Sequence, residues 1–153
     1  MKKLIALACF ITLPCLALAD SEQSLIGKWS CNGVQDAGDG LTILMGSNVN
    51  FKKNGRFHAT MKLIFKDPEL ETTVVATYRS NWALKDGYLD EKPTYVKIKK
   101  LSAAGRDMRH SAFAKDIKAS LMSYDPDDLA KVSFQSVSRV SFITEDVTIH
   151  CQR

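Results

Sequence analysis

The sequence predicts a mainly β protein: an antiparallel up-and-down barrel of about eight strands, with one helix inserted between strands five and six. Apolar and polar residues alternate along most of the chain after residue 20, which is the pattern of half-buried strands. Asn-Gly and Asp-Gly pairs separate several of these segments, as expected for hairpins. One segment instead shows helical spacing. A meander of this size is expected to close on itself, because closure removes the exposed sheet edges.

The N-terminus predicts export. Lys2 and Lys3 precede the apolar segment Leu4–Leu18, and Ala17-Leu18-Ala19 has the small-x-small pattern that signal peptidase recognises. We therefore expect residues 1–19 to be a signal peptide cleaved after Ala19, and a protein that is periplasmic or secreted, in a bacterial envelope. Lipid attachment at Cys15 is a weaker alternative, because the residues before it lack the pattern of a lipoprotein signal. No later segment is apolar enough to be expected to span a membrane.

The remaining chain, residues 20–153, has the length of a single domain. Loss of Lys2 and Lys3 lowers the formal charge from +4 to +2, so the sequence does not predict nucleic-acid binding. Cleavage also leaves two cysteines, Cys31 and Cys151. An even pair in an oxidising compartment predicts a disulfide. A redox-active pair is the alternative, but such pairs usually have Cys-x-x-Cys spacing.

The first predicted turn follows Phe51. A two-residue turn at Asn54-Gly55 would place Phe51 and Phe57 on opposite faces of the hairpin. A three-residue turn, Lys53-Asn54-Gly55, places them opposite each other and gathers the apolar residues on one face. Because strand register follows the buried face, we predict the three-residue turn, with Gly55 in the left-handed conformation.

The next strand, from Thr73 to Leu84, shows the same alternation. A two-residue turn at Asp86-Gly87 sets Leu84 opposite Leu89. The apolar positions then change parity, because Leu89 is odd-numbered whereas later ones are even. We predict a β-bulge at Lys92-Pro93 to reconcile them.

Residues 106–122 have apolar side chains at helical spacing and predict the inserted helix. Alternation returns in a strand at Val132 and Phe134 and another at Val140 and Phe142. A tight turn at residues 145–146 then pairs Phe142 with Ile149 and Val140 with Cys151. A Cys31–Cys151 bond would join the first strand to the last, where a barrel has to close.

Gly27 and Trp29 form a Gly-x-Trp motif at the start of the first strand. With the alternating strands that follow, this motif resembles the opening of lipocalin-like (calycin) barrels. The chain is similar to small secreted bacterial proteins of that kind, which have an early Trp-x-Cys and a late Cys. The resemblance implies that Trp29 closes one end of the barrel under a basic residue, for which Arg153 and Arg139 are both candidates.

No catalytic, cofactor or metal motif is predicted. The three histidines, at positions 58, 110 and 150, lack metal-ligand spacing. The acidic stretches at residues 36–40 and 125–128 lack the pattern of a calcium loop and are typical of turns. Neither a nucleophile elbow nor a set of triad residues is recognisable.

The predicted interior face mixes large and small side chains. One interpretation is a cavity for a small apolar ligand; the other is a packed core in which large and small residues interdigitate. The candidate ligand-binding residues are Phe51, Phe57, Met61, Tyr78 and Trp82.

The predicted outer face is basic. It could contact an acidic envelope protein or simply keep the protein soluble. Its cations are Lys52, Lys53, Arg56, Lys62, Arg79, Lys97, Lys99 and Lys100. We therefore expect an exported, non-enzymatic, lipocalin-like protein that binds a small hydrophobic ligand. The alternative is an exported protein-binding module, of the inhibitor or immunity type, with a filled barrel core.

Overall fold

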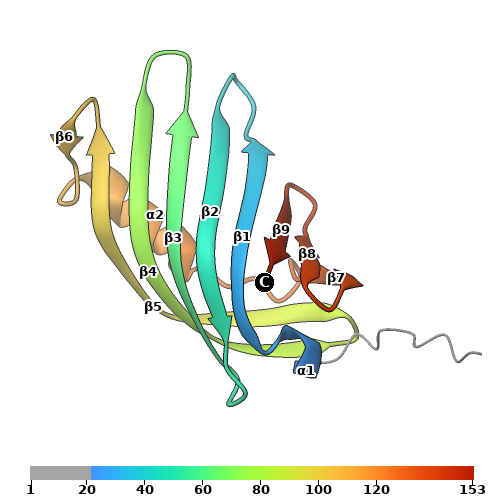
Figure 1. The fold of residues 1–153 in the computed structure, drawn as a ribbon. Coiled ribbons are helices and arrows are strands. Elements are labelled where there is room, and N and C mark those ends of the chain that lie inside the picture. The colour runs from blue at the N-terminus through green and yellow to red at the C-terminus, as the bar shows by residue number, and fades with distance from the viewer. Residues whose placement is uncertain (1–21) are drawn as a thin grey trace, which may run out of the picture.

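The computed structural model describes residues 22–153, so the expected signal peptide and its cleavage site lie outside the described residues. The described chain is mainly strand (Figure 1). The elements are, in order, α1 (Glu22–Leu25), β1 (Gly27–Asp36), β2 (Thr42–Phe51), β3 (Arg56–Lys66), β4 (Glu71–Lys85), β5 (Tyr88–Ala103), β6 (Arg106–Asp107), α2 (Ala112–Met122), β7 (Ala130–Ser136), β8 (Arg139–Ile143) and β9 (Thr148–Gln152).

The sheet closes into a ring of eight antiparallel strands. Strands β1 to β5 form one meander and β7 to β9 form a second. The ring closes because β5 pairs with β7 and β9 pairs with β1, while the two-residue β6 adds only to the edge of β5. The predicted fold class is confirmed, including the helix between the fifth and sixth strands of the ring.

The two seams between the meanders differ in extent. β1 and β9 share four residue pairs, among them Cys31 opposite Cys151, whereas β5 and β7 share only two. The predicted disulfide bridges Cys31 and Cys151 across the longer seam, over a sequence separation of 120. Because β7 to β9 are short, they lie beside only part of the tall sheet formed by β1 to β5 (Figure 1).

The β2–β3 hairpin has the predicted three-residue turn. Phe51 pairs with Phe57, and the Lys52 amide donates to the Arg56 carbonyl at 2.8 Å. Gly55 has a φ of +72°, a backbone conformation that costs a residue with a Cβ atom more than it costs glycine. The position of Gly55 therefore sets the register of the hairpin.

The β4–β5 hairpin also has the predicted register, with Leu84 opposite Leu89 across Asp86-Gly87. The predicted bulge is present, one residue later than expected. Thr94 lies between Pro93 and Tyr95, which pair with residues of β4, and is itself not paired with a residue of that strand. A second bulge at Lys99 was not predicted. Together the bulges keep apolar side chains pointing inward along β5 although their parity changes twice.

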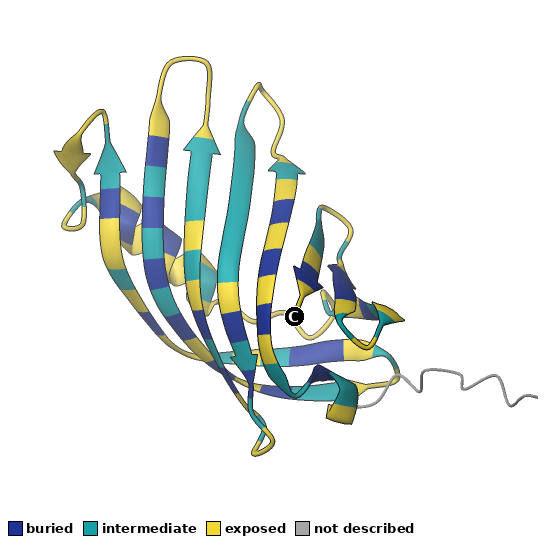
Figure 2. Ribbon diagram, viewed as in Figure 1, coloured by how far each residue is buried: buried dark blue, intermediate teal, exposed yellow. Residues whose placement is uncertain are grey.

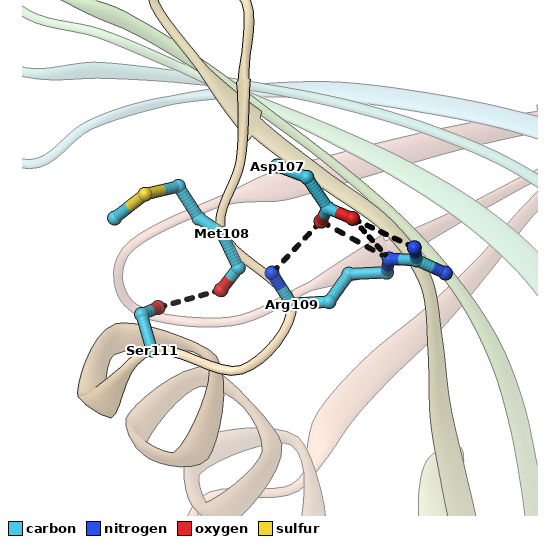
Figure 3. Close-up of polar contacts among 4 residues, drawn as sticks. All are labelled: Asp107, Met108, Arg109 and Ser111. Atoms are coloured by element: carbon cyan, nitrogen blue, oxygen red, sulfur yellow. Dashed lines mark hydrogen bonds and ion pairs between the residues drawn. The ribbon is translucent and has the colours of Figure 1, made fainter.

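Helix α2 starts at Ala112, later than the predicted Arg106. The chain first turns back through Ala104 and Gly105, both with positive φ, to form β6. Arg109 then folds onto the Asp107 carboxylate, and Ser111 donates to the Met108 carbonyl (Figure 3). The Ser111 side chain also accepts from the Ala114 amide and so caps the helix.

Two apolar clusters make up the core, and their residues form buried bands that alternate along the strands in Figure 2. The smaller one lies between α2 and the inner faces of β4 and β5 and consists of Val74, Leu101, Ala114 and Ile117. The larger one occupies the closed part of the ring and includes Leu25, Trp29, Phe51, Phe57, Trp82 and Phe142. The helix therefore covers the part of the tall sheet that the short strands do not reach.

Replacing both Cys31 and Cys151 with alanine is expected to lower the free energy of unfolding by about 2–5 kcal/mol, because the unfolded chain regains the freedom that the bond removes. Urea unfolding, followed by tryptophan fluorescence, measures this loss. Reduction of the wild-type protein should reproduce it, and should leave the double variant unaffected. Two reactive thiols in the folded, unreduced protein would contradict the assignment.

Candidate functional site

The interior of the ring contains a cavity of about 510 Å³. This volume lies within the range of about 300–1,000 Å³ that is usual for small-molecule sites. Four of the five predicted ligand-binding residues line it: Phe51, Phe57, Met61 and Tyr78. The other lining residues are Cys31, Ser47, Val49, Ala59, Leu89, Glu91, Ser120, Leu121, Asp128, Ala130, Phe142, Thr144 and Ile149.

Aromatic rings form one side of this cavity. The Phe51 ring contacts Phe57 edge-to-face, with centroids 4.7 Å apart, and stacks on Phe142 at 5.8 Å. Phe57 in turn meets Tyr78 at 6.0 Å. These contacts hold the rings in place, so the aromatic wall exists before any ligand arrives.

Trp82 is the one predicted ligand-binding residue that does not line the cavity. Its ring packs behind Phe51 at a centroid distance of 5.1 Å. Its indole Nε1 donates to the Lys52 and Arg56 carbonyls, both at 3.2 Å. Trp82 thus holds the β2–β3 hairpin in place at the end of the barrel where Trp29 lies. Its role is structural, and it does not contact the cavity.

The closed end is built around Trp29. The indole Nε1 donates to the Leu25 carbonyl at 2.8 Å, and Leu25 itself is fully buried. The Arg153 guanidinium lies 4.2 Å from the centroid of the Trp29 ring. Of the two basic residues considered from the sequence, Arg153 is therefore the one that covers Trp29.

Arg153 also ties the C-terminus to the N-terminal segment. Its Nη1 donates to the Ile26 carbonyl at 2.9 Å and its Nη2 to the Ser24 carbonyl at 3.3 Å. Its Nε donates to the Val137 carbonyl at 2.9 Å. Gly27 has a φ of +128°, and a Cβ atom there would lie 3.3 Å from Nη1 of Arg153. A glycine at this position therefore allows the guanidinium to approach the backbone closely.

Glu91 is a carboxylic acid in the cavity wall beside the aromatic rings, and it was not predicted as a site residue. Ser80 donates to its Oε1 at 2.9 Å. Glu91 is half-buried, since the cavity keeps part of its surface open. The protein packed around it nevertheless raises the pKa of the carboxyl, and hydrogen bonds from Tyr78 and Ser80 offset part of that rise. Burial and then the nearby Glu91 carboxyl raise the pKa of Tyr78.

A recess of about 250 Å³ adjoins the cavity and shares Tyr78, Leu89, Glu91, Asp128, Ala130 and Thr144 with it. The segment that follows α2 supplies most of its remaining wall: Ser123, Tyr124, Asp125 and Leu129. The Tyr124 hydroxyl donates to Asp90 at 2.9 Å and so ties this segment to β5. On its other side Asp90 binds the ammonium groups of Lys85 and Lys92.

The described residues contain no group of three or more His, Cys, Asp or Glu side chains that could hold a metal ion. His58 lies on the outer face, where burial first and then Lys52 and Arg79 lower its pKa. His150 Nδ1 lies 2.9 Å from Ser141 Oγ, but Ser141 is buried, and no hydrogen bond joins His150 to a carboxylate in the described chain. This pair therefore has no acidic partner of the kind that a hydrolytic triad uses within the described residues.

No protein-family model matches this sequence, and no curated protein sequence is significantly similar to it. Within residues 22–153, none of the helices is long and apolar enough to cross a bilayer.

Replacing Arg153 with alanine is expected to lower the free energy of unfolding by about 1–3 kcal/mol, because three carbonyls lose a charged donor and Trp29 loses its cation. Lysine at this position should restore only part of the stability, since it lacks the planar fork. Arg139→Ala is the matched control for loss of one positive charge. Denaturant unfolding measures all three, and an equal effect of the two alanine variants would contradict this role for Arg153.

Glu91→Gln is expected to stabilise the fold at neutral pH. The folded-state pKa of Glu91 is raised, so the folded protein binds its proton more readily than the unfolded chain does. The protonated Glu91 side chain therefore contributes its full stability at pH values below the ordinary pKa of a carboxyl. This contribution is lost as the pH rises through the raised pKa of Glu91 in the folded protein. Thermal melts across the acid-to-neutral range should show a gain for Glu91→Gln that disappears at low pH, and a pH-independent difference would contradict this interpretation.

Proposed function

We propose that this protein is an exported, non-enzymatic, lipocalin-like carrier that holds a small hydrophobic molecule inside its barrel. The supporting observation is the cavity of about 510 Å³, whose wall combines the aromatic rings of Phe51, Phe57 and Tyr78 with the flexible Met61. Rigid aromatic walls provide a large apolar contact area, and a methionine adapts to the shape of its occupant.

The arrangement at the closed end agrees with this proposal. Trp29, Leu25 and Arg153 fill that end with side chains and backbone hydrogen bonds. The cavity wall at the other side is formed by Leu121 and neighbouring residues of α2, together with Asp128 from the segment after it. A ligand would therefore enter past the helix and this segment.

Filling the cavity tests the proposal. Ala59 is buried and lines the cavity, so Ala59→Phe should occupy the space and abolish saturable binding of a neutral apolar dye such as Nile red. Thr60→Phe, which adds the same ring to the exposed outer face of β3, is the matched control and should bind like the wild type. Thermal melts check that both variants fold, since overpacking costs about 1–3 kcal/mol.

Native mass spectrometry of the protein purified from its exporting cell gives an independent result, because a carrier is expected to retain part of its ligand. If the wild-type protein carries no small molecule and shows no saturable dye site, the carrier proposal is wrong. The alternative would then be a protein-binding module that uses the basic outer face, where burial first and then Lys52, Arg79 and Arg56 lower the pKa of His58.

A further inference from the structure

The charge inside the barrel is of one sign. The cavity wall contains three ionisable side chains, Tyr78, Glu91 and Asp128, and none of its lining residues is Lys, Arg or His. The adjoining recess adds Asp125 and again no basic residue. A ligand in this space would therefore meet apolar surface, hydroxyl groups and carboxylates.

Glu91 lies where the two spaces meet, because it lines both the cavity and the recess. A molecule whose apolar body contacts the aromatic wall at Phe57 and Tyr78 would thus place its polar end near the Glu91 carboxyl. Ser80 donates to one oxygen of that carboxyl, which fixes the side chain against β4. The polar group is therefore held in position before a ligand binds.

The groups that face Glu91 do not neutralise it. Strand β4 contributes hydroxyl groups from Ser80 and Tyr78, and the segment after α2 contributes Asp128. Helix α2 contributes Ser120 and Leu121 to the same cavity. The adjacent residues of β5, Asp90 and Lys92, point to the opposite side of the strand and pair with each other there. No cation lies beside this half-buried carboxylate in the cavity wall, so a cation brought by a ligand could pair with it.

We propose that the ligand is a cationic amphiphile, an apolar molecule with a protonated amine, whose ammonium group pairs with Glu91 while its body fills the aromatic part of the cavity. This inference rests on the proposed carrier function and specifies its ligand class. Asp125 and Asp128 in the wall of the recess would favour the approach of a cation and disfavour fatty acids and other anionic amphiphiles.

Three probes with the same ten-carbon chain and different polar groups test the inference: decylamine, decanol and decanoate. The measurement is the displacement of Nile red from the processed protein by each probe at about pH 8. Decylamine is expected to bind about tenfold more tightly than decanol, as for a hydrogen bond between charged groups. Decanoate is expected to bind most weakly. Binding of decanoate as tight as that of decylamine would overturn the inference.

The variant Glu91→Gln keeps an acceptor for Ser80 and removes the charge. It should lower the affinity for decylamine about tenfold more than the affinity for decanol. Glu71→Gln removes an exposed carboxylate of the same kind on β4 and should leave the ranking of the probes as in the wild type. Equal preference for decylamine in wild type and Glu91→Gln would contradict the role of Glu91.

The pH dependence of the unmodified protein gives a second measurement that needs no variant. The preference for decylamine over decanol should fade as the pH is lowered from about 8, because Glu91 takes up a proton while the amine keeps its charge. If Nile red and decanol bind but decylamine has no advantage at any pH, the ligand class is wrong while the carrier function stands. If none of the four binds, both proposals fail.

Discussion

The barrel depends on one seam, the pairing of β1 with β9. Two meanders that are each open at their edges form a ring through two seams, and the longer one pairs the first and last strands of the described chain over four residue pairs. The disulfide Cys31–Cys151 and the contacts of Arg153 with Trp29 and the N-terminal segment lie along this seam. The other seam, between β5 and β7, has two residue pairs. The cavity and the closed end both include residues of β1 that lie beside this seam, such as Cys31 and Trp29.

Much of this architecture could be predicted from the sequence, because turns and alternation act over short distances. Gly55 and Gly87 mark tight turns, and the requirement that apolar residues share one face then determines the register of both hairpins. The same argument paired Val140 with Cys151 and placed the cysteines at the point of closure. Four of the five residues expected to line an interior site do line the cavity.

Other features follow from tertiary contacts and leave little trace in local sequence. Helix α1 has only four residues, which is too short for a periodic apolar pattern to predict it. It is held by hydrogen bonds from Trp29 and Arg153. The bulge at Lys99 was missed, although the inward-facing apolar positions change there from even-numbered Ile98 to odd-numbered Leu101. Glu91 did leave a signal: it has the same parity as Leu89 and precedes the predicted bulge, so its inward direction was implied. A carboxylate on an inward position was therefore the clue to the polar group in the cavity.

The hydrogen bond between Arg153 and the Ser24 carbonyl has a consequence for the connectivity of the fold. It brings the two ends of the described chain into contact. Joining these ends would therefore leave the order of strands around the ring unchanged. A short peptide linking these ends would make the backbone circular, and new ends could be opened in an exposed turn such as the one at Gly38. The ring of strands, and not the position of its ends, is therefore what defines this molecule.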